Sequence, residues 1–274
     1  MNSTVTRTIS GAVFLVIMIA GLLLNQYVFA ALMLFIMVVM MLEFYRMTVG
    51  EEYKGSRFFA ILSGVTLFIL FFFHLSAGVS VKVLCIAIFP LIAVLMASLD
   101  EPEDKVPVFS NIFTGVFYIA APVTLFSIPA FVSGEFNGMI LLCFFIIIWV
   151  SDVGAYCFGM LLGKKFPKKL SPIISPKKTW VGAIGGFIVS IIAGVVLNLV
   201  GWLNFPMVHC MVVAALMNIA GVYGDLFESH WKRCYGVKDS GKIMPGHGGL
   251  LDRFDSSLFA IPVAIAYLVS INLI

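Results

Sequence analysis

The chain has 274 residues, of which 61% are hydrophobic and 11% are charged, and its mean hydropathy is +1.09. Soluble domains carry about 25% charged residues, so this composition excludes an ordinary soluble protein and predicts that lipid surrounds most of the chain. The formal net charge of +3 is small, and the five cysteines form no CxxC pair, which argues against a zinc or disulfide framework.

Nine apolar runs are long enough to cross a bilayer, which requires about 17–25 residues. The runs are 9–25, 28–45, 57–74, 79–99, 109–131, 138–162, 180–201, 206–224 and 256–274. A cleaved signal peptide is the alternative for the first run, but polytopic proteins commonly begin in this way, which favours a retained span. Pro122 and Pro129 in the fifth run are tolerable kinks. The pattern predicts an all-α polytopic membrane protein with about nine transmembrane helices. It also predicts a single transmembrane domain over 1–274, with the N-terminal spans in 1–137 and the catalytic spans and cytoplasmic loops in 138–274.

Basic residues divide the loops into two classes. When the loops are numbered alternately, every Lys and Arg except Lys82 falls on the side of the N-terminus. The positive-inside rule then predicts a cytoplasmic N-terminus and a C-terminus outside. The outer loops are short and nearly uncharged, so function is expected in the cytoplasmic loops 163–179 and 225–255. Inverted repeats of the kind found in many transporters are not evident.

A carboxylate interrupts the sixth run, where WVSDVGAYCFG includes Asp152. An ionisable residue at membrane depth is by default a functional hypothesis, and the alternative is a structural ion pair with a lysine. Ser151, Gly154 and Gly159 nearby favour close packing of helices. We take Asp152 as a candidate substrate-binding residue.

The loop after the sixth run contains ISPKKTWVG, residues 174–182. Ser175 suits a helix N-cap and Pro176 the first helical position. The N-terminus of a helix attracts phosphate, and two lysines and a threonine add charge and a hydroxyl. The candidate phosphate-binding residues are Ser175, Lys177, Lys178 and Thr179. The alternative is that these lysines only anchor the next span at the headgroups, which is our interpretation of Lys164, Lys165, Lys168 and Lys169.

The last loop is the most charged part of the chain. Four polar residues recur there at steps of three and four, which predicts one face of a helix that continues from the eighth run. They are Asp225, Glu228, Ser229 and Lys232. Gly224 permits close approach of another helix or a ligand. Asp252 and Asp255 lie three residues apart at the start of the ninth run. Because a carboxylate at membrane depth is costly unless it is paired or metal-bound, we expect Asp225 and Asp252 to bind magnesium.

A glycine-rich stretch, PGHGG, precedes Asp252. Successive N–H groups at glycines can form a nest for an anion. His247 could be an acid/base group, a phosphate donor or a helix-capping residue. The surrounding cations are Lys232, Arg233, Lys238, Lys242 and Arg253. Carboxylates, cations and glycines together predict a site for a magnesium-bound polyphosphate, and the lack of a Walker A motif argues against a P-loop NTPase.

The stretch SHWKRCYGVKDSGKIMPGHGGLLDRFD, residues 229–255, closely resembles the signature of the phosphatidate cytidylyltransferases, also called CDP-diacylglycerol synthases. The matching positions are Ser229, Lys232, Arg233, Lys238, Asp239, His247, Gly248, Gly249, Asp252, Arg253 and Asp255. The SD-x-GAY run around Asp152 and the SPKKTW run also resemble family features. Two positions depart from the pattern: Val181 stands where the family commonly has Glu, and Trp231 where an aliphatic residue or Phe is usual.

The resemblance implies a reaction of CTP with phosphatidate that yields CDP-diacylglycerol and pyrophosphate, assisted by one or two Mg²⁺ ions. The residues expected to act in catalysis are Lys232, Arg233, Lys238, Asp239, His247, Asp252, Arg253 and Asp255. Those expected to bind substrate are Asp152, Ser175, Lys177, Lys178, Thr179, Ser229, Gly248 and Gly249. Asp225 and Asp252 are expected to ligate the metal with Asp239 or Asp255 nearby, and Lys232, Arg233 and Arg253 are expected to hold phosphates.

The expected partners are CTP, the phosphatidate lipid and the bilayer, with no nucleic acid, and a homodimer is left open. The expected location is the plasma (inner) membrane, with several spans and the active site facing the cytoplasm. One alternative is a CTP-dependent enzyme that acts on another membrane lipid, such as a polyprenol. A second is a transporter whose charged loops gate a path, but that function would distribute charge along the spans.

Overall fold

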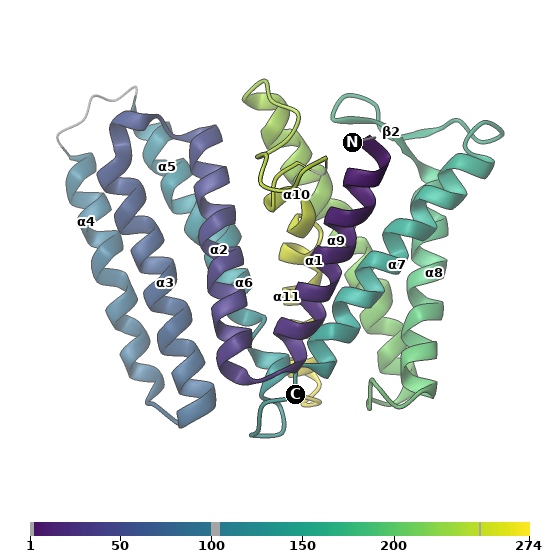
Figure 1. Ribbon diagram of the computed structural model, residues 1–274, viewed down its shortest axis with the longest axis horizontal. Coiled ribbons are helices and arrows are strands. Elements are labelled where there is room, and N and C mark those ends of the chain that lie inside the picture. The colour runs from purple at the N-terminus through teal and green to yellow at the C-terminus, as the bar shows by residue number, and fades with distance from the viewer. Residues whose placement is uncertain (1–2, 100–104, 247) are drawn as a thin grey trace. The chain divides into compact units, whose positions relative to one another are not determined.

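The computed structural model describes residues 3–99, 105–246 and 248–274, most of them in helices (Figure 1). The chain divides into two compact units. The N-terminal unit comprises 1–136 together with 239–253, and the C-terminal unit comprises 137–238 together with 254–274. The glycine-rich segment 239–253 therefore packs with the first half of the chain, although both of its flanks belong to the second.

In the described ranges, eight helices are long and apolar enough to cross a membrane, and the shorter apolar stretch Arg7–Leu23 precedes them. The helices are α1 (Ser3–Leu23), α2 (Gln26–Thr48), α3 (Lys54–Ala77), α4 (Ile88–Ser98), α5 (Val106–Gly115), α6 (Ala121–Leu125), α7 (Met139–Leu162), α8 (Trp180–Leu199), α9 (Met207–Cys234), α10 (Leu251–Phe254) and α11 (Ser257–Ser270). The chain is a multi-pass membrane protein, and the predicted all-α fold is confirmed. One predicted boundary is wrong, because the last span begins at Leu251. Helix α9 continues to Cys234, as predicted for the polar residues that follow the eighth run.

Helix α2 lies in the core of the N-terminal unit, where it packs against α1, α3 and α5. Its entry is capped by Asn25, whose side chain accepts hydrogen bonds from the backbone N–H groups of Tyr27 and Val28. The Tyr45 hydroxyl donates to the carbonyl of Ile112 at 2.7 Å. This bond ties α2 to α5 and satisfies a phenol that has no access to solvent.

The fifth apolar run is not one regular helix. A π-helical turn, η4 (Val116–Ala120), follows α5, and a 3₁₀ turn, η5 (Ile128–Ala130), follows α6. Pro122 and Pro129 lie in the first turns of α6 and η5. Because proline lacks an N–H group, a continuous ladder of hydrogen bonds cannot pass through these positions. The changes of helix type fit the predicted kinks.

In the C-terminal unit, α7 and α8 pack closely along a line of glycines. A Cβ atom at Gly154 would lie 2.8 Å from the Cβ of Val189, and one at Gly186 would lie 2.9 Å from the carbonyl oxygen of Ser151. Helices in lipid approach this closely only where small residues face each other. The close packing predicted around Gly154 is therefore confirmed.

A short β-hairpin precedes α8. Strand β1 (Lys169–Ser171) pairs antiparallel with β2 (Ser175–Thr179), and α8 begins only at Trp180. The N-cap is Thr179, whose Oγ1 accepts a hydrogen bond from Gly182 N at 3.2 Å. The predicted helix start at Ser175 and Pro176 is therefore wrong, because pairing with β1 keeps the chain extended as far as Thr179.

The close contact between α7 and α8 at these glycines yields a stability prediction. In Gly186→Ala the added methyl group would meet a backbone oxygen, which cannot move aside as a flexible side chain could, so we expect a loss of roughly 1–3 kcal/mol in the free energy of unfolding. The matched control is Gly55→Ala on α3, where a Cβ atom would meet nothing within 4 Å. Thermal unfolding of both variants in detergent checks this, and equal stability would contradict the close packing.

Candidate functional site

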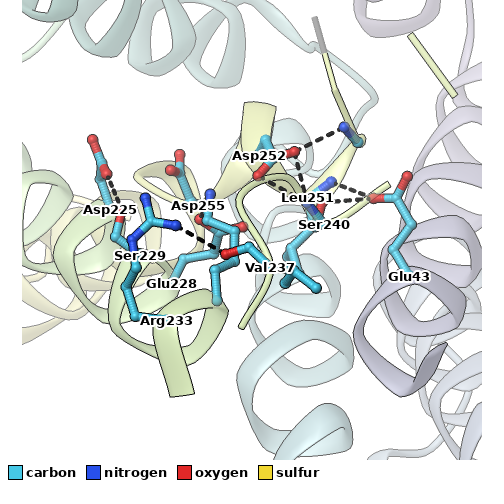
Figure 2. A network of polar contacts seen from close by, with 12 residues as sticks. Glu43, Asp225, Glu228, Ser229, Arg233, Val237, Ser240, Leu251, Asp252 and Asp255 are labelled. Atoms are coloured by element: carbon cyan, nitrogen blue, oxygen red, sulfur yellow. Dashed lines mark hydrogen bonds and ion pairs between the residues drawn. The ribbon is translucent and has the colours of Figure 1, made fainter. Parts of the chain in front are cut away.

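The last two turns of α9 carry paired charges in the C-terminal unit. Glu228 and Lys232 form an ion pair one helical turn apart, and the two residues are 1% and 8% exposed. The Ser229 hydroxyl donates to Asp225 Oδ1 at 3.2 Å (Figure 2). The predicted helical face is therefore confirmed. Because a buried charge is tolerated when it has a direct partner, these pairs let the helix continue beyond its apolar part.

Strand β2 brings a lysine to this face. Lys178 forms an ion pair with Asp225, and both side chains are about one-third exposed. Two separate predicted motifs, the SPKK run and the end of α9, therefore meet within one unit. Lys177, next in sequence, is exposed. The hydroxyl of Thr179 caps α8, so its first role is structural.

A further carboxylate, that of Asp255, lies between α10 and α11. It is within electrostatic range of Asp225, Asp152 and Lys232, and its Oδ1 accepts a hydrogen bond from Ser256 N at 2.7 Å. We call Asp152, Asp225 and Asp255 the acidic cluster; they come from α7, α9 and the entry to α11. Gly224 allows this approach, since a Cβ atom there would lie 2.5 Å from the carbonyl oxygen of Asp255.

In the N-terminal unit, a buried glutamate organises the glycine-rich segment. Glu43 of α2 is only 3% exposed. Its Oε1 accepts a hydrogen bond from Leu250 N at 3.0 Å, and its Oε2 accepts from Leu251 N at 2.9 Å and from the Ser240 hydroxyl at 3.2 Å (Figure 2). The two N–H groups belong to the start of α10 and have no partner within that helix. The carboxylate therefore fixes both ends of the segment to α2.

The Glu43 carboxylate lies so close to the backbone of the glycine-rich segment that two positions there require glycine. A Cβ atom at Gly241 would lie 2.2 Å from Glu43 Oε1, and one at Gly249 would lie 2.6 Å from Oε2. Gly248 has a φ of +89°, in the left-handed region that favours glycine. Part of the glycine content of PGHGG is thus explained by an anion that the chain itself supplies.

Asp252 also binds its own loop. Its Oδ2 accepts hydrogen bonds from Gly249 N at 2.8 Å and from Ser240 N at 3.0 Å (Figure 2). The Gly249 amide, which was predicted to face a bound anion, is therefore occupied by an internal carboxylate. The predicted ligation of magnesium by Asp225 and Asp252 stays a prediction, and these two residues belong to different units.

The remaining predicted residues are on the surface. Arg233 donates from Nη1 to the carbonyl of Val237 at 2.9 Å. Lys238, Asp239 and Arg253 are exposed, and their predicted roles stay predictions. His247 lies outside the described residues. Within the described part of the chain, no group of three or more His, Cys, Asp or Glu side chains is arranged to hold a metal ion.

A model of the cytidylyltransferase family matches residues 5–271. The chain belongs to this family. Among curated relatives called phosphatidate cytidylyltransferase, one from Staphylococcus saprophyticus is 45% identical over 127 residues, which are 46% of this chain and 48% of the relative. One from Staphylococcus haemolyticus is 49% identical over 119 residues (43% and 45%), and one from Bacillus subtilis is 46% identical over 117 residues (43% and 42%). The matched stretch spans less than half of each relative.

Sequence reasoning missed Glu43. Its signal was present, because an acidic residue inside the apolar run 28–45 is costly unless it has partners. The partners, however, lie more than 190 residues further along the chain. Nothing local in the sequence connects them to Glu43.

Substituting Glu43 tests its structural role. Glu43→Gln keeps the shape, but only one of its two terminal atoms accepts hydrogen bonds, so at least one buried N–H group loses its partner. We expect the free energy of unfolding to fall by roughly 2–5 kcal/mol and trypsin to cleave faster after the exposed Lys242.

Unfolding in detergent and timed trypsin digestion, with mass spectrometry of the fragments, measure the two effects. The matched control is Glu52→Gln in the same unit, because Glu52 is exposed and a surface charge contributes little to stability. If Glu43→Gln behaved like this control, the segment would not depend on the buried carboxylate.

Proposed function

We propose that the chain transfers the cytidylyl group of CTP to phosphatidate and releases pyrophosphate, so that CDP-diacylglycerol forms at the cytoplasmic face of the membrane. Family membership and the names of the relatives support this proposal. The observation that carries it is the acidic cluster with its two lysines, Lys178 on strand β2 and Lys232 in the last turn of α9. A site for a lipid phosphate and a nucleotide triphosphate needs charge at such a position.

The reaction joins two anions. An oxygen of the lipid phosphate forms a bond to the α-phosphorus of CTP, and the bond from that phosphorus to the oxygen bridging to the β-phosphate breaks, with pyrophosphate as the leaving group. A phosphate monoester is already nucleophilic, so no strong general base is required. The catalytic task is to position both anions and to offset their repulsion.

The lysines have separate roles in this proposal. Lys178 is partly exposed in its pair with Asp225, so its ammonium group can turn to an incoming phosphate. Lys232 is buried against Glu228, and we assign it to balancing the charge of the cluster rather than to direct contact. Arg233 is exposed and can bind phosphate oxygens as a bidentate donor.

The acidic cluster fits magnesium. The Asp255 carboxylate interacts electrostatically with those of Asp225 and Asp152, and carboxylates in a membrane helix bundle are costly unless a cation offsets them. Mg²⁺ is usually held by one or two carboxylates with substrate phosphates and water, so a cage of three acidic side chains is not required. Asp225 and Asp255 would hold the ion, and the ion would offset charge on the triphosphate and on the leaving pyrophosphate.

Asp225→Asn tests the site directly. It removes the charge that faces Lys178 and any bound cation, and we expect turnover to fall roughly 10²–10³-fold, by analogy with the loss of one electrostatic contact in an active site. Detergent-dispersed phosphatidate and labelled CTP are the substrates, and CDP-lipid is measured across a magnesium titration. Glu135→Gln, a change in a loop of the other unit, is the control. Near-normal turnover of Asp225→Asn at every magnesium level would remove the acidic cluster from the mechanism.

Orientation is tested separately. Cysteines at Glu135 and Lys168 are introduced into a variant without the five native cysteines, and intact cells are treated with an impermeant thiol reagent. The excess of basic residues on one side predicts labelling at 135 and protection at 168. Labelling at 168 would place the lysine-rich loop outside and would contradict a cytoplasmic site.

A further inference from the structure

An apolar groove lies inside the N-terminal unit, and the mechanism above does not use it. Its volume is about 280 Å³, and it is lined by α1, α2, residues 243–245 and Leu250. Most of the lining side chains are apolar, among them Val13, Ile17, Phe35 and Ile36. Sites for complete small molecules have volumes of roughly 300–1,000 Å³, so this groove suits one hydrocarbon chain rather than a two-chain lipid.

One wall of the groove is made by the signature segment. Met244, Pro245 and Leu250 line it. The Ser10 hydroxyl of α1 donates to the Pro245 carbonyl at 3.1 Å, and the Leu250 N–H is held by Glu43 at 3.0 Å. The segment that supplies the glycine-rich turn therefore also shapes the groove, and an occupant would lie directly beside that turn.

A cation lies next to two residues that line the groove, because Arg7 is one helical turn before Ser10 and contacts the residue after Pro245. The side chain of Arg7, on α1, packs against Gly246, where a Cβ atom would lie 2.9 Å from Arg7 Cγ. Arg7 is exposed, and among residues 3–99, 105–246 and 248–274 no carboxylate forms an ion pair with it. An apolar groove beside a guanidinium that has no carboxylate partner matches an anionic lipid, since guanidinium binds phosphate oxygens in a bidentate manner.

We propose that this groove binds one acyl chain of the phosphatidate acceptor, with Arg7 at the lipid phosphate. The inference rests on the proposed function and identifies the lipid subsite of that function. A hydrocarbon chain gains little free energy when it moves from bilayer to an apolar groove. The groove therefore acts by orientation: it holds the lipid so that its phosphate is presented beside the glycine-rich turn.

Photolabelling tests occupancy without turnover. The probe is phosphatidate with a diazirine at the end of one acyl chain, added to the purified full-length protein without CTP. Labelled peptides from 10–36 and 243–250 are expected. Val13→Phe narrows the groove and should reduce labelling roughly tenfold. One methylene group in an apolar pocket changes discrimination between ligands by roughly 10- to 200-fold, and we take the lower end of that range.

The matched control is Val16→Phe, which lies on the same helix, is 66% exposed and does not line the groove. It should label like the unmodified protein. The proposal is overturned if the label falls outside these peptides, if both variants label equally, or if excess phosphatidylcholine competes as well as phosphatidate does.

Kinetics separate this proposal from the proposed function. With dioleoyl phosphatidate, Val13→Phe should lower kcat/KM by a similar factor, but with dioctanoyl phosphatidate the loss should be smaller. Arg7→Gln should raise KM for phosphatidate and leave KM for CTP unchanged. If the variants formed CDP-lipid normally and showed no dependence on chain length, the groove proposal would be wrong and the proposed function would stand. Groove labelling in a protein that forms no CDP-lipid would instead overturn the proposed function.

Discussion

The N-terminal unit depends on one buried carboxylate. Glu43 lies in an apolar helix with almost no exposed surface, and an ion in that position is stable only when its oxygens are hydrogen-bonded. The chain meets this requirement with two backbone N–H groups and one hydroxyl from a distant segment. The conformation of that segment follows, because the carboxylate leaves no room for side chains at Gly241 and Gly249.

The C-terminal unit meets the same requirement with ion pairs. Lys178 and Lys232 each lie against a carboxylate of α9, and these pairs allow charged residues to remain helical at the end of a membrane span. Close contact between helices depends on glycines such as Gly154 and Gly186, whose absent side chains let backbones approach. Charge compensation and small residues thus act together to place the acidic cluster.

The spans and the charged face of α9 could be predicted because they depend on local patterns. Hydropathy marks the helices, and steps of three and four residues mark the face. The continuation of α9 beyond Asp225 was predictable from these steps although hydropathy falls there, and the ion pair of Glu228 with Lys232 supports that part of the helix. The start of α8 was misjudged because Ser175 and Thr179 are both suitable caps and the choice depends on pairing with β1. The bonds of Asp252 to its own loop and the role of Glu43 depend on tertiary contacts that no short pattern records.

The long separation between Glu43 and its partners has a consequence for biosynthesis. Leu251 follows Glu43 by 208 residues, so at roughly 5–20 residues per second a ribosome needs about 10–40 s to reach it. During that interval α2 is already available for insertion, but its carboxylate lacks every hydrogen bond of the finished protein. The N-terminal unit therefore stays incomplete during that interval, because the hydrogen bonds of Glu43 form only after most of the second half has been synthesised.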